Sequence, residues 1–425
     1  MKPNNFLLTF LILVVFSPYP LYGQDKLNFE EALRIDFVLS GNHQEQTATI
    51  VNYLKSPNYQ CSPGQAIPDF DYGSCRVLLI EKEKHDTLFK KGFCTLFEEW
   101  QSTPEANKKD RAFRQTVETP FPLKEVVVKL ELRDSTGLFR TLRSEFFSPS
   151  AIIRKLSPEK FLSKTIHGIE NPSRQLDLLI LAEGYTKNET ENFFEDAEKI
   201  SSDLLNTPPY DQLQDKITIR AMAVPSYDSG TDDPRKEEWR NTAMGSSFNT
   251  FGTDRYLESL YTWKIFDYAA AHPRDHIIVL VNTKKYGGGG VYNHFSITSA
   301  GHPQSAKVLI HEIGHGLAGL GDEYYSPDVS YSDFFDLKTE PWHPNISTLV
   351  DFESKWKTLI DESTPIPTPA KNKYKDITGA FEGAGYSAKG IYRPALNCRM
   401  KSNEADGFCE VCRLSIKKAV NFYTK

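Results

Sequence analysis

The chain has 425 residues, a length that predicts roughly two or three domains. Its apolar, aromatic and charged fractions are 39%, 12% and 25%, which are ordinary values for a soluble globular protein. The net charge of −6 is mild and gives no reason to expect nucleic acid or an anionic membrane as a partner.

The N-terminus, residues 1–23, has the pattern of a secretory signal peptide. Lys2 supplies a positive start, residues 6–16 form an apolar run, and residues 17–23 contain helix breakers and small residues. The run is short for a membrane span, although an uncleaved anchor is the alternative. We therefore expect an exported protein, in the periplasm, at the cell surface or outside the cell, with no membrane span after signal removal.

Residues 24–150 are expected to form a β-rich accessory domain. The segments 33–39, 76–81 and 125–133 carry strand patterns and are separated by turn residues, which predicts a small β-sandwich. This region shows no catalytic constellation, and the sequence does not separate a docking module from a structural support. Residues 151–172 lose periodicity and contain prolines, so we place a linker there.

The cysteines fall into an early group and a late group. In an exported protein disulfides are permitted, but their connectivity does not follow from sequence. A bridge within each group is a candidate, and the late C-x-x-C pair could instead be half of a structural zinc site. The early group is Cys61, Cys75 and Cys94, and the late group is Cys398, Cys409 and Cys412.

From residue 173 onward the pattern changes to alternating strands and helices. Continuous apolar runs are typical of strands that are covered on both faces, and they alternate here with segments of helical spacing. This order predicts an α/β sheet. The predicted strands cover residues 176–181, 216–224 and 276–282, and the predicted helices lie within 193–204 and 256–271.

Four glycines at 287–290 lead into a short strand pattern. The run lacks the Lys-Ser/Thr of a phosphate loop and opens no helix, so a nucleotide site is rejected. Gly289, Gly290, Val291 and Tyr292 are candidates for an edge strand on which a substrate peptide could pair as an added strand. A plain flexible hairpin is the alternative.

The most specific motif is His311-Glu312-Ile313-Gly314-His315, an H-E-x-x-H pattern. On a helix, residues four apart lie on the same face, so His311 and His315 can bind one metal ion. Glu312 is placed to act as general base on a water molecule. Glycines then break the helix, and the chain presents Asp322 as the expected third ligand, with Glu323 as the alternative. The pattern predicts one catalytic Zn2+ ion.

Residues 308–325 resemble the zinc signature of the IgA peptidase family of metallo-endopeptidases, and more loosely that of the metzincins. In metzincins the helix motif is followed by glycine and then by a third ligand, and here Gly319 and Asp322 each stand one position late. The resemblance implies an α+β or α/β multidomain protein, with an N-terminal β-sandwich and a metzincin-like zinc-peptidase domain at 173–425. It also implies that Met400, within Cys-Arg-Met, is the methionine-turn residue beneath the metal.

These observations predict an exported zinc endopeptidase that hydrolyses peptide bonds. Tyr392 and Arg393 are candidate hydrogen-bond donors to an oxyanion or to substrate. The family resemblance suggests a polypeptide substrate, perhaps a secreted protein of a host. Two alternatives stay open, which are a secreted binding protein with a vestigial metal site and a zinc amidase acting on a non-protein amide.

Overall fold

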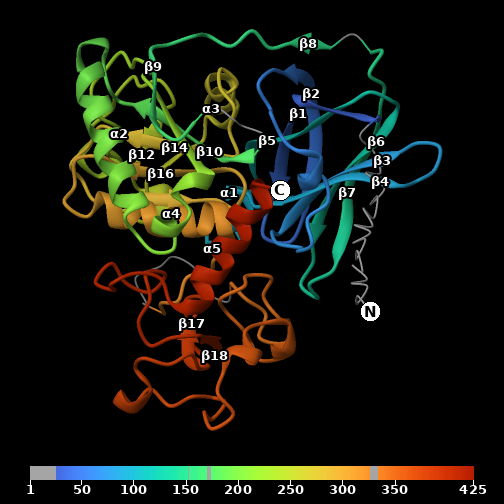
Figure 1. Ribbon diagram of the computed structural model, residues 1–425. Helices are drawn as coiled ribbons and strands as arrows, with labels where there is room; N and C mark the ends of the chain where they lie inside the picture. Colours follow the sequence, from blue (N-terminus) through green and yellow to red (C-terminus); the bar gives the residue numbers. More distant parts are fainter. Residues whose placement is uncertain (1–24, 152, 170–173, 326–333) are drawn as a thin grey trace, which may run out of the picture.

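The computed structural model describes residues 25–151, 153–169, 174–325 and 334–425 (Figure 1). The expected signal peptide, residues 1–23, lies outside these ranges, as do residues 170–172 of the expected linker. Within the described ranges, no helix combines the length and the apolar character needed to cross a bilayer.

The N-terminal region is built from two four-stranded sheets that share one hydrophobic core. Leu33 and Ile35 of the first sheet and Val77 and Val128 of the second belong to the same buried cluster. The short helix α1 (Leu96–Gln101) adds the fully buried Trp100 to it. The first sheet has the order β5 (Arg111–Pro122), β1 (Leu27–Gly41), β2 (Gln46–Ser56), β8 (Arg154–Lys155), and the second β4 (Thr87–Phe93), β3 (Cys75–Glu81), β6 (Val126–Arg133), β7 (Phe139–Phe147).

The second region is organised around a six-stranded sheet, so the mixed α/β class predicted from the sequence is confirmed. Its four inner strands run parallel to one another, and each edge carries an antiparallel strand. One edge strand, β9, lies within the segment expected to be a linker. The order is β15 (Gly288–Gly290), β16 (Phe295–Ser299), β14 (His276–Val281), β10 (Leu176–Glu183), β11 (Ile217–Met222), β9 (Ser163–His167).

Helices cover both faces of this sheet, as its continuous apolar strands require. Alternate residues of β10 point to opposite faces: Leu178 packs in the core with α2, α4 and α5, whereas Leu179 packs with α3. Helix α3 begins at Thr262, later than the expected start at residue 256, because residues 258–259 form strand β13. The helices are α2 (Thr190–Leu205), α3 (Thr262–Ala269), α4 (Ser305–Ala318) and α5 (Glu410–Tyr423).

The remaining regular elements are short. Two two-stranded sheets complete the regular structure of the described residues, and the second hangs below the main body as a hairpin (Figure 1). They are β12 (Ser246–Ser247) with β13 (Glu258–Ser259), and β17 (Phe381–Ala384) with β18 (Ser387–Arg393). Single 3-10 turns are Pro63–Gln65, Lys187–Glu189, Tyr210–Gln212, Gln214–Lys216, Pro234–Lys236, Thr250–Gly252, Phe352–Ser354, Lys357–Leu359 and Asn372–Tyr374.

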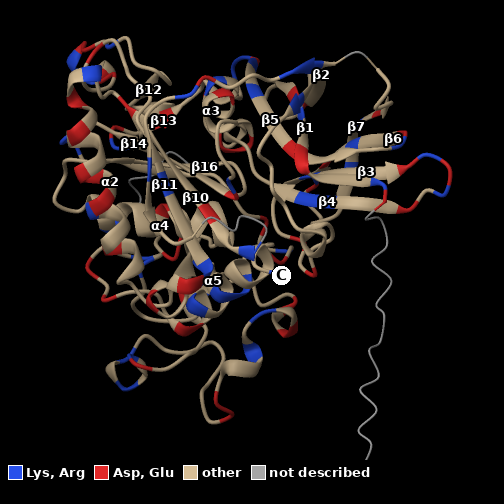
Figure 2. Ribbon diagram, turned by 45° about the horizontal axis from the view of Figure 1, so that its top comes forward, with Lys and Arg blue, Asp and Glu red and all other residues tan. Residues whose placement is uncertain are grey.

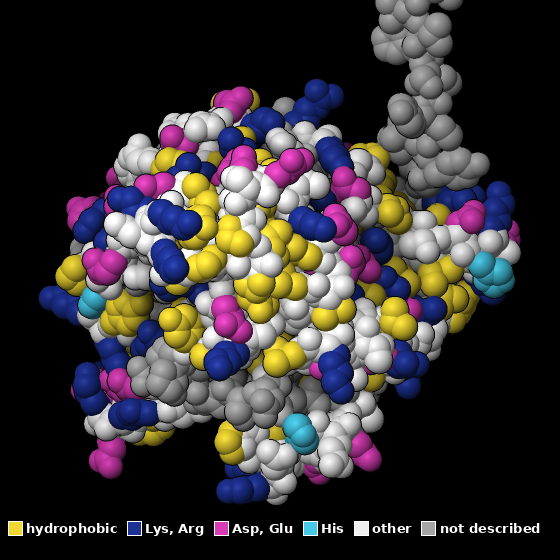
Figure 3. Space-filling model, turned by 90° about the horizontal axis from the view of Figure 1, so that it is seen from below, with side chains coloured by type: hydrophobic (Ala, Val, Ile, Leu, Met, Phe, Trp, Pro, Cys, Tyr) yellow, Lys and Arg dark blue, Asp and Glu magenta, His cyan; other side chains and the backbone are white. Residues whose placement is uncertain are grey.

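The two regions are joined by polar contacts as well as by the chain. Arg34 Nη1 of β1 lies 2.7 Å from Asp267 Oδ1 of α3. The Cys94 amide donates to the Tyr292 carbonyl at 2.9 Å. The C-terminus returns to the first region, where Ser62 Oγ donates to the Lys425 carbonyl at 2.8 Å. Charged residues of both signs are interspersed along both regions (Figure 2) and across the face seen from below (Figure 3).

The glycine run has a packing role at the sheet edge. A Cβ added to Gly290 would lie 2.4 Å from the backbone oxygen of Glu312, and one added to Gly288 would lie 2.5 Å from Val308 Cγ1. The glycines therefore let β15 lie directly against α4. The close backbone neighbour is the helix of the H-E-x-x-H motif.

Candidate metal centre

Helix α4 places the two histidines of the motif on one half-buried face. Its opposite face, with Leu309, Ile313 and Leu317, is buried against the sheet. The helix ends at Gly319, which adopts the left-handed conformation with φ of +64° that favours glycine at this position. The turn that follows brings the next residues back to the face that carries His311 and His315.

Three potential ligand atoms meet on this face. The two Nε2 atoms of His311 and His315 lie 3.0 Å apart, and Asp322 Oδ1 lies 3.1 Å from the first and 3.3 Å from the second. In a tetrahedral zinc site with metal–ligand distances of about 2.1 Å, ligand atoms are separated by about 3.4 Å. The observed triangle is slightly tighter than this and is of the right size for one ion.

The hydrogen bonds of the imidazoles fix which nitrogen faces the triangle. His311 Nδ1 lies 3.0 Å from the Arg399 carbonyl oxygen, and His315 Nδ1 lies 2.6 Å from that of Leu320. A carbonyl only accepts, so each Nδ1 carries a proton and Nε2 is the nitrogen that faces the triangle. This is the orientation that metal-binding histidines use.

The charges of the site favour a cation at its centre. Burial by itself would lower the pKa of His315, but the Asp322 carboxylate outweighs burial and raises that pKa to about 9. Burial opposes ionisation of Asp322 as well, yet the two imidazoles hold its pKa well below the usual range. The position between these groups therefore holds positive charge, which can be a proton or a metal ion.

The acid next to Asp322 points elsewhere. Glu323 Oε1 accepts a hydrogen bond from Asn345 Nδ2 at 3.0 Å and lies 3.2 Å from Cys412 Sγ. The structure thus brings Asp322, and not Glu323, to the two histidines.

Glu312 lies beside the two histidines, since its carboxylate is within 4.8 Å of both imidazoles. Burial raises the pKa of Glu312, a direction that suits a group that accepts a proton.

Met400 lies directly beneath the motif helix. It is fully buried, and a Cβ added to Gly314 would lie 2.8 Å from its sulfur, so the thioether fills the space below the helix between the two histidines. The Met400 carbonyl accepts from the Glu323 amide at 2.9 Å. The Arg399 carbonyl accepts from His311. Residues 399–400 therefore contact both the motif helix and the segment that carries Asp322.

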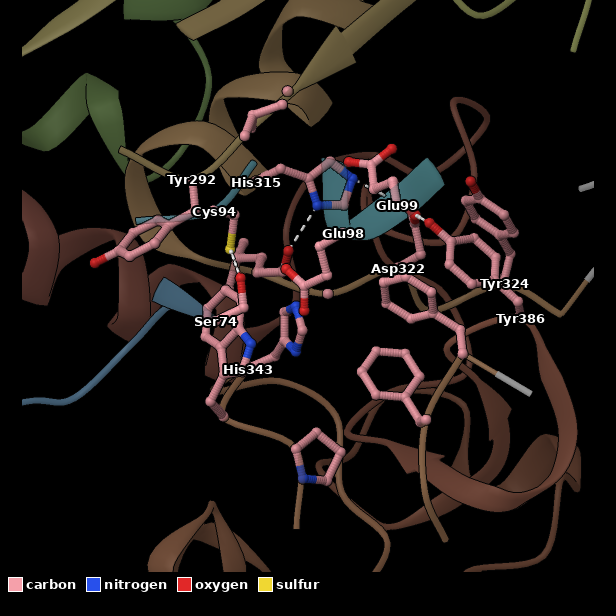
Figure 4. A pocket seen from close by; sticks show the side chains of 18 of the residues that line it. Ser74, Cys94, Glu98, Glu99, Tyr292, His315, Asp322, Tyr324, His343 and Tyr386 are labelled. Carbon is pink, nitrogen blue, oxygen red and sulfur yellow. Dashed lines mark hydrogen bonds and ion pairs between the residues drawn. The ribbon is translucent and has the colours of Figure 1, made fainter. Parts of the chain in front are cut away.

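Tyr386 is a site residue that the sequence did not reveal. It lies on the turn between β17 and β18, and its hydroxyl donates to Asp322 Oδ2 (Figure 4). The Gly385 amide also donates, at 2.8 Å, to the Asp322 carbonyl. The hairpin therefore orients the carboxylate. The contact spans 64 positions along the chain, and no local pattern marks it.

Replacing Tyr386 by Phe tests this orienting role. The change removes the hydroxyl and keeps the ring, so Asp322 Oδ2 loses a donor. Outer partners of metal ligands typically contribute about 10–100-fold to metal affinity or activity, and we expect a loss in that range. Zinc affinity of Tyr386→Phe, measured by competition with a chelating dye, checks the prediction. Unchanged affinity and unchanged turnover would show that the carboxylate is oriented without Tyr386.

A cavity of about 1050 Å³ opens in front of the three ligand atoms. Both regions of the chain line it, because Ser74, Cys94 and Glu98 of the N-terminal region form part of the wall (Figure 4). The candidate edge residues also line it, and so do Trp342 and His343, whose rings stack at 3.7 Å. The candidate edge residues are Gly289, Gly290, Val291 and Tyr292.

Two predicted contact residues are absent from the cavity wall. Arg393 is buried and donates to the carbonyls of Glu382 and Gly383, and the Tyr392 backbone pairs with Ser347. Neither residue lines the cavity. The tyrosines that do reach it near Asp322 are Tyr324 and Tyr386.

Comparison with known proteins agrees with this geometry. Residues 165–376 and 370–420 match the family described as IgA Peptidase M64, and residues 24–143 match its companion, described as Peptidase M64 N-terminus. None of the curated proteins matches the chain. The two family matches cover most of the chain. The chain therefore belongs to the IgA peptidase M64 family.

Proposed function

We propose that the protein is an exported zinc-dependent endopeptidase. The observation that carries this proposal is the triangle of His311 Nε2, His315 Nε2 and Asp322 Oδ1, with the Glu312 carboxylate beside it, at the floor of a large cavity. Family membership supports peptidase activity. Export rests on the signal pattern of residues 1–23.

A zinc ion held by these three residues would polarise the scissile carbonyl and lower the pKa of water to roughly 7. Glu312 then takes a proton from the attacking water and delivers it to the leaving amine. Its raised pKa favours this exchange, because a carboxylate with a higher pKa accepts a proton more readily. Tyr386 and the carbonyls of Arg399 and Leu320 hold the ligands in place.

The cavity wall suggests how a polypeptide would bind. β15 is the last strand in the order of its sheet, Gly288 forms a parallel bridge with Tyr256, and Gly289 and Gly290 line the cavity. We propose that an extended peptide pairs along this strand through backbone hydrogen bonds. The substrate would be a protein, and a secreted host protein fits an exported enzyme. The N-terminal region would act as a β-sandwich that completes the wall of a metzincin-like domain.

Cleavage of casein and of immunoglobulin, with and without a chelator, tests the proposal. We expect hydrolysis of at least one of these proteins, its loss with the chelator and its return when Zn2+ is restored. A protein that binds zinc but cleaves neither substrate would favour the vestigial binding protein. Hydrolysis of cell-wall amides in place of proteins would favour the amidase.

A further inference from the structure

A second group of metal-ligand side chains lies behind the candidate active site. It consists of Glu323, Cys398, Cys409 and Cys412, and each contributes one ligand atom within 4.8 Å of all the others. Cys409 and Cys412 stand at the start of α5, Cys398 precedes Met400 by two positions, and Glu323 follows Asp322. We refer to these four residues as the cysteine cluster.

The distances in the cysteine cluster fit a tetrahedral ion. The sulfurs of Cys398 and Cys412 are 3.8 Å apart, and Glu323 Oε1 lies 3.2 Å from Cys412 Sγ and 3.9 Å from Cys409 Sγ. With zinc–sulfur and zinc–oxygen bonds of about 2.3 and 2.1 Å, sulfurs would lie about 3.8 Å apart and a sulfur–oxygen pair about 3.6 Å apart.

The polar groups around the cysteine cluster point to a missing partner. Glu323 is completely buried, and its Oε2 has no hydrogen-bond partner within the described structure. A buried carboxylate oxygen without a partner is costly, and a bound cation would remove that cost. The Cys398 sulfur already accepts a hydrogen bond from the Cys409 amide at 3.3 Å, which is a typical contact for a sulfur that ligates a metal.

The sulfur atoms of the cysteine cluster are not placed as in a disulfide. All three sulfurs are free, and the separation of 3.8 Å between Cys398 and Cys412 far exceeds the bond of about 2.05 Å. A disulfide would also use two sulfurs and leave the third thiol beside a buried carboxylate. A single ion uses all four side chains and offsets the charge of Glu323.

We propose that Glu323, Cys398, Cys409 and Cys412 bind a second, structural zinc ion. Three thiolates with one carboxylate suit zinc, which takes sulfur and oxygen ligands in closed tetrahedral sites. Binding forms three metal–sulfur bonds and one metal–oxygen bond, the thiol protons leave to solvent, and no electron is transferred. The four protein ligands leave no open position for substrate.

This ion would brace the catalytic centre from behind. It would fix the 398–400 segment, whose Arg399 carbonyl holds His311, and the 322–323 segment, which carries Asp322. It would also fasten both segments to α5. The bracing role rests on the proposed function, whereas the existence of the ion does not.

Metal analysis of the purified full chain tests the inference without any substitution. We expect two zinc ions per chain by elemental analysis. Replacement of zinc by Co2+ should give a thiolate-to-cobalt charge-transfer band in the near ultraviolet, because the candidate ligands at the cysteine cluster include three sulfurs, whereas those of the His311 site are nitrogen and oxygen. One ion per chain, or no such band, would overturn the proposal, and so would a disulfide among the three cysteines in mass spectra of the unreduced protein.

Variants assign the second ion to its ligands. Cys409→Ser with Cys412→Ser should bind one ion fewer and lose the cobalt–sulfur band, whereas Cys61→Ser, a change at a buried cysteine elsewhere, should keep both. For the case in which the double variant does not fold, Glu323→Gln preserves shape and an acceptor for Asn345. It should release one of its two ions to a chelator at least tenfold faster than the unaltered protein, and an unchanged rate would contradict the assignment.

The two proposals fail in different ways. A protein that holds the thiolate-bound ion but cleaves no peptide would support this inference and refute the proposed function. A protein that cleaves peptides with one ion and no cobalt–sulfur band would refute this inference alone.

Discussion

The Glu312→Ala protein is expected to keep its full complement of zinc and to lose turnover by about 10²–10⁴-fold, the range that a positioned general base contributes. The carboxylate lies beside the two imidazoles but is not part of the triangle of ligand atoms. Its removal therefore takes away the proton acceptor and leaves the three metal ligands intact. Elemental analysis together with the rate of peptide hydrolysis measures both effects in the same sample.

Glu353→Ala is the matched control for this change. Its side chain is 71% exposed on a short turn far along the chain from the motif, so its loss should alter neither zinc content nor turnover. Loss of zinc from Glu312→Ala would mean that the glutamate helps to hold the ion. Turnover equal to that of the unaltered protein would refute the proposed mechanism, because another group would then be the base.

The parts of the site that follow from local geometry could be predicted from the sequence. The spacing of His311 and His315 places both rings on one helical face whatever the rest of the fold does. The continuous apolar runs of β10 and β14 likewise indicate strands covered on both sides, and the sheet has that form. In both cases the pattern and the structure depend on residues that are close in sequence.

The parts that depend on distant contacts could not be predicted. Asp322 and Glu323 are adjacent acids, and only the turn after Gly319 and the position of Asn345 decide which one faces the histidines. Tyr386 reaches Asp322 because a hairpin folds back across the site. Cys409 and Cys412 are candidates for a disulfide with Cys398 or for half of a zinc site, and the sequence does not show that Glu323 lies beside them.

Packing also changed the interpretation of two segments. The glycines at 288–290 suggested space for a substrate backbone, but part of that space is occupied by α4, which lies against Gly290. The segment 163–167 lies in the stretch expected to be a linker because that stretch loses periodicity and contains prolines, yet it pairs with β11 as an edge strand. An edge strand needs little apolar surface of its own, so its sequence carries a weak strand signal.

The His311→Ala protein is expected to lose the catalytic ion and, with it, all measurable peptide hydrolysis. Removal of one of three ligands leaves His315 and Asp322, which can pair with each other through a proton because the pKa of His315 is raised to about 9. That proton competes with the metal at neutral pH. We therefore expect zinc affinity at this site to fall by more than the roughly 100-fold upper range seen for outer-shell changes.

His43→Ala, a change at an exposed histidine of the N-terminal region, should retain zinc and activity. The cysteine cluster shares no ligand with His311, so His311→Ala should still bind one ion and still show the cobalt–sulfur band. Zinc should then raise the Tm of the variant, but by less than it raises that of the unaltered protein, since each bound ion adds stability that grows with the logarithm of the zinc concentration relative to its Kd. If zinc content and hydrolysis both survived the loss of His311, the ion would have to sit elsewhere, and the triangle would be an ordinary buried hydrogen-bonded group.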